Sequence, residues 1–323
     1  MATAAQLKSL IRSHFSKEPE RFYTIALQVA AHEAKQGHAA LAHDIRNLVD
    51  SEKKKSGPRV LHFPKDLKGL VLSENSRTSK NTLVASSELQ ARIEQIIHEY
   101  RQQEKLKAHG LSHRRKVLLI GPPGTGKTMT AKVLAHELQI PLQTIQVDRL
   151  VTKFMGETSA KLRQIFDLMQ EVHGVYLFDE FDAIGGERSM DNDVGEMRRV
   201  LNAFLQFIEQ DTSDSIVVAA TNNPKLLDQA LFRRFDDVLY YDFPDEEERK
   251  QLIGNVLSTF KSARFGWKTV LRKSAGLSHA EVVQACTDAI KKSILSDKNK
   301  VNASELCDMI SHRHSAYQGR RSK

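Results

Sequence analysis

Several features that would assign this sequence to a particular class of protein are missing from it. Its 323 residues include two cysteines, Cys286 and Cys307, which are too few for a disulfide framework or a metal cluster. No apolar run approaches the roughly 20 residues needed to span a bilayer, and the first residues lack the apolar stretch of a signal peptide. None of the 13 histidines falls in an HExxH pattern. We therefore expect a cytoplasmic protein without a membrane span or a protease motif.

Acidic residues are fewer than basic ones, and this leaves a formal net charge of +8. Much of the excess is local, in residues 53–55, 113–116 and 313–323. A basic chain attracts acidic partners such as nucleic acid. The sequence has no basic stripe interleaved with aromatic residues, however, and a solvated basic surface explains the charge more simply. Nucleic acid therefore stays an alternative, less favoured partner.

The clearest motif is the segment GPPGTGKT at residues 121–128, which fits the P-loop pattern G-x-x-x-x-G-K-[ST]. An apolar, strand-like run at 116–120 precedes it, and a helical pattern at 129–139 follows it. Glycines allow the backbone N–H groups to surround phosphate oxygens, and the positive end of the following helix points at the same anion. We expect Lys127 to reach the β- and γ-phosphates of ATP and the Thr128 hydroxyl to hold Mg²⁺. The expected nucleotide contacts here are Gly121, Pro122, Pro123, Gly124, Thr125, Gly126, Lys127, Thr128 and Met129.

A second apolar strand, at 175–178, ends in Asp179 and Glu180. Asp179 is expected to hold Mg²⁺, and Glu180 to polarise the attacking water as a general base. Many strands end in acidic turns, so this pair alone is a weak signal. Behind a P-loop it becomes a strong one.

Three segments in this order resemble the AAA+ ATPases: GPPGTGKT at 121–128, VYLFDEFDAIGG at 175–186 and VVAATNNPKLLDQALFRRFD at 217–236. Within that superfamily they resemble the AAA clade of katanin, spastin and the unfoldases, over about residues 60–315. The resemblance implies an α/β P-loop fold with a parallel sheet, followed by an α-helical lid domain. It also implies hydrolysis of ATP with Mg²⁺ in a ring, expected to be a hexamer.

The resemblance further implies that Asn222 is the polar sensor that orients the attacking water beside Glu180. It makes Arg233 and Arg234 the arginine fingers that reach the γ-phosphate of a neighbouring subunit. A simpler explanation for Asn222 is an Asx turn before Pro224. A simpler explanation for the two arginines is a pair exposed on the protein surface.

In the related unfoldases and severing enzymes, a loop of the type Lys-aromatic-aliphatic-Gly-Glu lines the pore of the ring. The matching residues here are Lys153, Phe154, Met155 and Gly156, followed by Glu157. An aromatic ring at a loop tip can grip side chains of any sequence, and a thioether adapts to varied surfaces. The alternative is that Phe154 packs against its own domain.

Two further nucleotide contacts are implied by position. Gly69 lies where the family touches the adenine, and Ala280 lies in the segment GLSHAE at 276–281 of the lid. In that segment His279 stands where the family has a glycine, which is a departure from the usual pattern.

The expected domains are a helical bundle at 1–55, a linker at 56–80, the nucleotide-binding domain at 81–244, the lid at 245–315 and a basic tail at 316–323. Apolar spacing predicts three helices in the first region, at 4–15, 20–35 and 39–51. A single long helix is expected at 87–108. The N-terminal helices could recruit an adaptor, a substrate or a separate protease, or could stabilise a ring.

These observations together predict a ring-forming ATPase that couples hydrolysis of Mg-ATP to remodelling, unfolding or threading of protein substrates through a central pore. One alternative is a nucleic-acid-dependent ATPase of the loader or transposition-helper type. Another is a chaperone that does not thread its client but releases or holds it according to the bound nucleotide.

Overall fold

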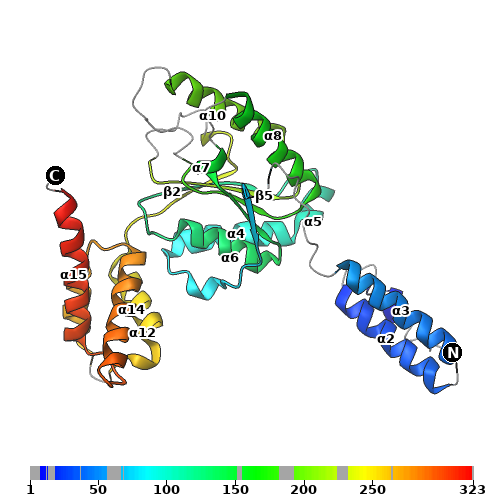
Figure 1. Ribbon diagram of the computed structural model, residues 1–323, viewed down its shortest axis with the longest axis horizontal. Coiled ribbons are helices and arrows are strands. Elements are labelled where there is room, and N and C mark those ends of the chain that lie inside the picture. The colour runs from blue at the N-terminus through cyan, green and yellow to red at the C-terminus, as the bar shows by residue number, and fades with distance from the viewer. Residues whose placement is uncertain are drawn as a thin grey trace. The chain divides into compact units, whose positions relative to one another are not determined.

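The computed structural model describes residues 8–11, 13, 19–36, 38–56, 67, 69–150, 155–181, 193–223, 232–262 and 265–321. The chain divides into two compact units, residues 1–63 and residues 64–323 (Figure 1). Among the described residues, no helix combines the length and the apolar character needed to cross a membrane.

The first unit is built on a helical hairpin, in which α2 (Pro19–Lys35) packs along α3 (Ala39–Ser56). Small and branched apolar side chains close the contact: Ile25, Ala26, Val29, Ala30, Ala42 and Val49. Residues 8–11 and 13 are also helical. The third predicted helix continues five residues further than expected, to Ser56, which is the first residue of the predicted linker.

The second unit contains a six-stranded sheet of the order β1-β3-β4-β5-β2-β6. The strands are β1 (Val71–Glu74), β2 (Lys116–Ile120), β3 (Leu142–Ile145), β4 (Val175–Phe178), β5 (Ile216–Thr221) and β6 (Asp237–Tyr240). Every pairing is parallel except that of β1 with β3, which is antiparallel. The predicted α/β class with a mostly parallel sheet is confirmed. The segment 56–80, expected to be a linker, contributes the edge strand β1.

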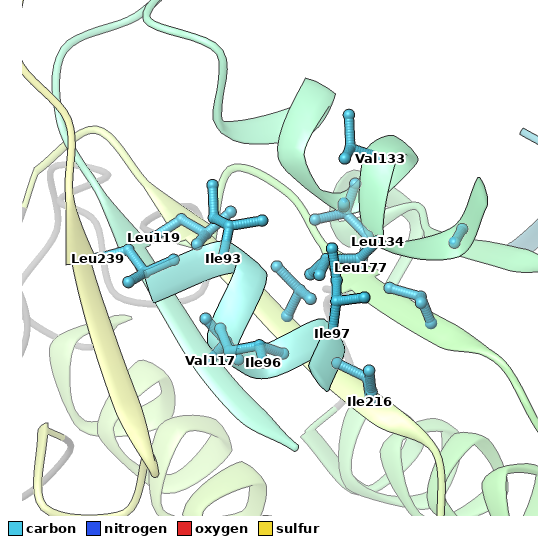
Figure 2. Close-up of a cluster of buried hydrophobic side chains, with 14 of the residues drawn as sticks. Ile93, Ile96, Ile97, Val117, Leu119, Val133, Leu134, Leu177, Ile216 and Leu239 are labelled. Carbon is cyan, nitrogen blue, oxygen red and sulfur yellow. The ribbon is translucent and has the colours of Figure 1, made fainter. Parts of the chain in front are cut away.

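Helices cover both faces of the sheet, and Figure 1 shows α4 and α6 on one face and α7, α8 and α10 on the other. Their bounds are α4 (Ser87–Arg101), α6 (Lys127–Leu138), α7 (Val147–Leu150), α8 (Met155–Glu171) and α10 (Asp193–Gln210). Aliphatic side chains of α4 and α6 meet those of the central strands in one apolar cluster (Figure 2). The opposite face is aromatic, with the rings of Phe166, Phe178 and Phe204 in mutual contact.

The helix expected at 87–108 is interrupted. Helix α4 ends at Arg101, and α5 (Gln103–Ala108) follows after Gln102, whose φ is −104°. The two helices lead to the basic segment 113–116.

Acidic side chains hold this basic segment in place. Arg114 lies 3.4 Å from Glu99 and 3.3 Å from Asp237. Arg115 pairs with the buried carboxylate of Asp211. The segment is therefore part of the folded core at the start of β2, and two of its positive charges are compensated within the chain.

The lid region is a separate layer of helices: α12 (Glu246–Leu257), a 3-10 turn η4 (Ser258–Phe260), α13 (Trp267–Lys273), α14 (His279–Leu295) and α15 (Ala303–Arg321). Capping boxes begin two of them, Asp245 with Glu248 at α12 and Ser278 with Glu281 at α14. An apolar core of their own joins these helices. Helix α13 was not predicted, and α15 continues to Arg321 through most of the predicted tail.

Candidate nucleotide-binding site

The P-loop lies at the carboxyl ends of the parallel strands. Ile120, the last residue of β2, pairs with Thr221, the last residue of β5. Strand β5 also pairs with β4, whose last residue Phe178 lies opposite Ala219. The residues that follow these strands therefore meet at one edge of the sheet, where open α/β sheets bind ligands. They include three that the sequence singled out, Gly121, Asp179 and Asn222.

Close contacts with neighbouring segments explain the first two glycines of the loop. A Cβ on Gly121 would lie 2.3 Å from the carbonyl oxygen of Tyr241. Gly124 has a φ of +76°, and a Cβ there would lie 2.8 Å from Oγ of Ser278. A side chain at either position would force the loop away from β6 or from the lid.

Hydrogen bonds within the loop keep its lysine in place. Lys127 begins α6 and is buried, and its Nζ donates to the carbonyl oxygens of Gly121 at 2.7 Å and Pro122 at 2.8 Å. The hydroxyl of Thr125 also donates to the oxygen of Pro122, at 2.8 Å. The cationic amine is thus held inside the curve of the loop, where phosphate oxygens would be bound.

The two residues expected to hold Mg²⁺ are in direct contact. Oγ1 of Thr128 donates to Oδ2 of Asp179 at 2.6 Å. Hydroxyl and carboxylate oxygens are hard ligands of the kind that Mg²⁺ prefers. The pair therefore fits a magnesium site beside the phosphate loop.

Glu180 has an unusual backbone conformation for a non-glycine residue, with a φ of +51°. Its N–H donates to Oδ1 of Asp179 at 2.9 Å, and the next residue, Phe181, is fully buried and donates its N–H to Ala220 at 2.8 Å. A left-handed conformation costs a residue with a Cβ roughly 1–2 kcal/mol. The anchored neighbours hold this conformation, and the side chain of Glu180 stays exposed to solvent at the mouth of the site.

A cleft of about 490 Å³ extends from the loop toward the lid. Its polar end is formed by Lys127, Thr128, Asp179, Glu180 and Asn222. Its other walls come from the turn before α4, from the loop and the start of α6, and from the lid: Thr82, Leu83, Val84, Pro123, Gly124, Gly126, Met129, Leu252, His279, Ala280 and Val283. A charged end and a largely apolar end suit a nucleotide, whose phosphates and base differ in the same way.

Most of the expected nucleotide contacts line this cleft, but Gly121, Pro122, Thr125 and Gly69 do not. Gly69 lies in the turn before β1, where its carbonyl oxygen accepts a hydrogen bond of 3.1 Å from Arg149. The wall that it was expected to supply is formed by residues 82–84, which the sequence analysis did not identify. The sequence signal that could have identified this wall is a short apolar pair, Leu83 and Val84, that follows a polar stretch.

The lid is docked onto the phosphate loop through the first turn of α14. The backbone N–H of Ala280 donates to the carbonyl oxygen of Gly124 at 2.9 Å. His279 lies beside it and is largely buried. Burial lowers the pKa of His279, and the nearby backbone of Val84 offsets only part of this effect. The imidazole is therefore neutral near pH 7.

The two candidate fingers lie away from this cleft. Arg233 is exposed, and the guanidinium of Arg234 pairs with Glu209 at the end of α10. Within the described part of the chain, neither arginine lines the cleft of its own subunit. Lys153 and Phe154 of the predicted pore loop lie outside the described residues. Met155 and Gly156 form the start of α8.

Comparisons with known proteins match this geometry. Residues 117–243 match the family model described as "ATPase family associated with various cellular activities (AAA)". An uncharacterized AAA family ATPase of Sinorhizobium fredii, y4kL, is 32% identical over 310 residues, covering 93% of this chain and 92% of that protein.

Two other relatives are similar over less of their own length. A protein of Methanothermobacter thermautotrophicus, named as a 26S proteasome regulatory subunit homolog, is 31% identical over 59% of this chain and 53% of its own. The ATP-dependent zinc metalloprotease FtsH 1 of Methylacidiphilum infernorum is 30% identical over 79% of this chain and 41% of its own. The similarity to these two is therefore to a part of each protein.

Proposed function

The chain belongs to the AAA family of ATPases, and from that premise we propose that it forms a ring, a hexamer, that uses ATP hydrolysis to remodel, unfold or thread protein substrates. As a member of this family it is an ATP hydrolase. The observation that carries the proposal is the meeting of Lys127, Thr128, Asp179, Glu180 and Asn222 at one end of a single cleft.

Binding of the phosphates is the task of the P-loop. Its backbone N–H groups and the amino end of α6 would surround the phosphate oxygens, and the ammonium of Lys127 would neutralise part of their charge. Thr128 and Asp179 would hold Mg²⁺, which neutralises charge on the phosphates when it is bound. The apolar walls at Leu83, Val84 and Val283 would cover the base.

Hydrolysis requires a base for the attacking water. The carboxylate of Glu180 is exposed at the cleft and would accept the proton of that water, while the amide of Asn222 would orient it. The arginines lie away from the cleft of their own subunit, which supports a role at the site of a neighbour. Arg233 or Arg234 would there stabilise the charge that develops on the γ-phosphate.

The substrate part of the proposal is supported by sequence. Phe154 and Met155 have the residue types of a polypeptide-gripping loop. Two partly matching relatives carry the names of a proteasome subunit homolog and of a protease. The main alternative, a nucleic-acid substrate, is supported by the basic segments, but Arg114 and Arg115 are paired with carboxylates.

The substitution Glu180→Gln tests the nucleotide chemistry and the ring together. The variant keeps the P-loop, so we expect it to bind ATP with near-normal affinity, hydrolyse it at least 100-fold more slowly and accumulate as a ring. Light scattering after size-exclusion chromatography with Mg-ATP measures the mass of that ring. Near-normal turnover would remove Glu180 as the base, and a monomer with ATP bound would contradict ring assembly.

A further inference from the structure

The cleft itself indicates where the base of a nucleotide lies. The phosphates must lie at Lys127 and Thr128, because the cation and the end of α6 are there. The base then extends toward the apolar end, which is bounded by Leu83 and Val84 on one side and by the first turns of α14 on the other. A nucleobase has apolar faces and a polar edge, so its edge needs a hydrogen-bonding group on this wall.

His279 is the polar side chain on that wall. It lines the cleft and also a second, smaller cavity of about 190 Å³. Hydrogen bonds of the residues on either side hold the backbone of His279 in place. Ser278 caps α14 together with Glu281, and Ala280 is hydrogen-bonded to the P-loop.

Both ring nitrogens of His279 are shielded from solvent and form no hydrogen bond of good geometry with a described residue. Buried polar groups without a hydrogen-bond partner are unfavourable and therefore rare in native proteins, and such a group usually has a reason. A neutral imidazole has one donor and one acceptor nitrogen. It can therefore serve the mixed donor and acceptor edge of a base.

We propose that His279 hydrogen-bonds to the base of the bound nucleotide and is a determinant of its affinity. The inference rests on the proposed function, because it assigns a residue to the same nucleotide site. It distinguishes His279 from its neighbour Ala280, which acts through the backbone and holds the lid on the loop. Loss of the imidazole should weaken contacts with the base and leave contacts with the phosphates unchanged.

Calorimetric titration of the full chain with Mg-ATP and with Mg-tripolyphosphate, which lacks the base, separates these contributions. His279→Phe keeps a ring of similar size without the nitrogens. We expect it to weaken ATP binding about tenfold and to change tripolyphosphate binding less than twofold. His279→Asn, which restores a donor and an acceptor, should recover part of the loss and serves as a second variant if the phenylalanine impairs folding.

An equal loss for both ligands would show that His279 only supports the docked lid, and an unchanged affinity for ATP would show that it does not touch the base. Either result would overturn the inference while leaving the nucleotide site in place. A wild-type protein that bound neither ligand would overturn the proposed function itself.

Discussion

The backbone N–H of Ala280 donates a 2.9 Å hydrogen bond to the carbonyl oxygen of Gly124, and this bond joins the lid to the phosphate loop. It brings α14 so close that Gly124 has no room for a Cβ beside Ser278. The walls of the cleft therefore come from two regions of the chain that are far apart in sequence. A change in the phosphate loop can move the lid through this contact, and the reverse is also true.

Substitution of Gly124 by alanine should disrupt this docking. The new Cβ would lie 2.8 Å from Oγ of Ser278, in a residue whose φ is +76°. We expect the affinities for Mg-ATP and for Mg-tripolyphosphate both to fall at least tenfold, because the loop itself is displaced. Calorimetric titration with the two ligands measures the effect.

Gly276→Ala is the matched control for this substitution. Gly276 lies just before the same helix and has a similar φ of +81°, but a Cβ there would meet nothing within 4 Å. The control carries the backbone strain without the collision, so its nucleotide affinity should stay within about twofold of the wild type. Equal losses in Gly124→Ala and Gly276→Ala would contradict a specific contact between lid and loop.

The arginine fingers can be tested by mixing two inactive variants. Lys127→Ala loses its own nucleotide site but keeps its arginines, and Arg233→Ala has the opposite defect. A finger contributes roughly 1,000-fold or more to turnover, so each variant alone should be nearly inactive. Mixed rings should regain ATPase activity, measured by phosphate release, because the intact site of one subunit meets the intact arginine of another.

A mixture that forms rings without any recovery of ATPase activity would contradict the assignment of Arg233 as a finger.

The ion pair of Arg234 with Glu209 provides a further comparison, because it holds the second arginine within its own subunit. Pairs this exposed contribute at most about 1 kcal/mol to stability. Glu209→Gln should therefore leave the fold intact and free Arg234 for a neighbouring site.

His113 should make the fold sensitive to acid. The residue is 3% exposed, and burial lowers its pKa below the ordinary value of 6.5. The unfolded chain therefore binds this proton at a higher pH than the folded protein does. The part of the free energy of unfolding that depends on neutral His113 is fully present above pH 6.5. It is lost as the pH falls from there through the lowered pKa of His113 in the folded state.

His113→Phe tests this prediction, because it keeps an aromatic ring against Tyr100 and removes the titration. The melting temperature of the wild type should fall more between pH 7.5 and pH 5.5 than that of the variant. His279 titrates in both proteins and cancels in the comparison. Equal falls in melting temperature would show that His113 does not contribute.

Local patterns in the sequence were sufficient to predict the central part of the fold. The strand at Lys116–Ile120 and the strand at Val175–Phe178 have the expected bounds, because each is an uninterrupted apolar run with a turn or polar residue after it. The phosphate loop could be predicted equally well, since its glycines and lysine have the spacing that phosphate binding requires.

Other features depend on contacts between distant residues and could not be predicted in this way. The pairing of Arg115 with Asp211 joins residues that are 96 positions apart, and it makes the basic segment 113–116 part of the folded core. Helix α13 is seven residues long, begins after Gly266 and has no side-chain cap, so its sequence carried little signal. The place of Leu83 and Val84 on the cleft wall depends on how the turn before α4 packs.

The most direct test of a protein-handling ATPase is the steady-state ATPase rate of the wild type and of Phe154→Ala. Each is measured alone, with an unfolded protein and with single-stranded DNA. We expect the unfolded protein to stimulate the wild type severalfold, and Phe154→Ala to lose this stimulation while keeping its basal rate, since the aromatic ring is proposed to grip the polypeptide. Stimulation by DNA that persists in Phe154→Ala, without stimulation by protein, would contradict the account and favour a nucleic-acid substrate.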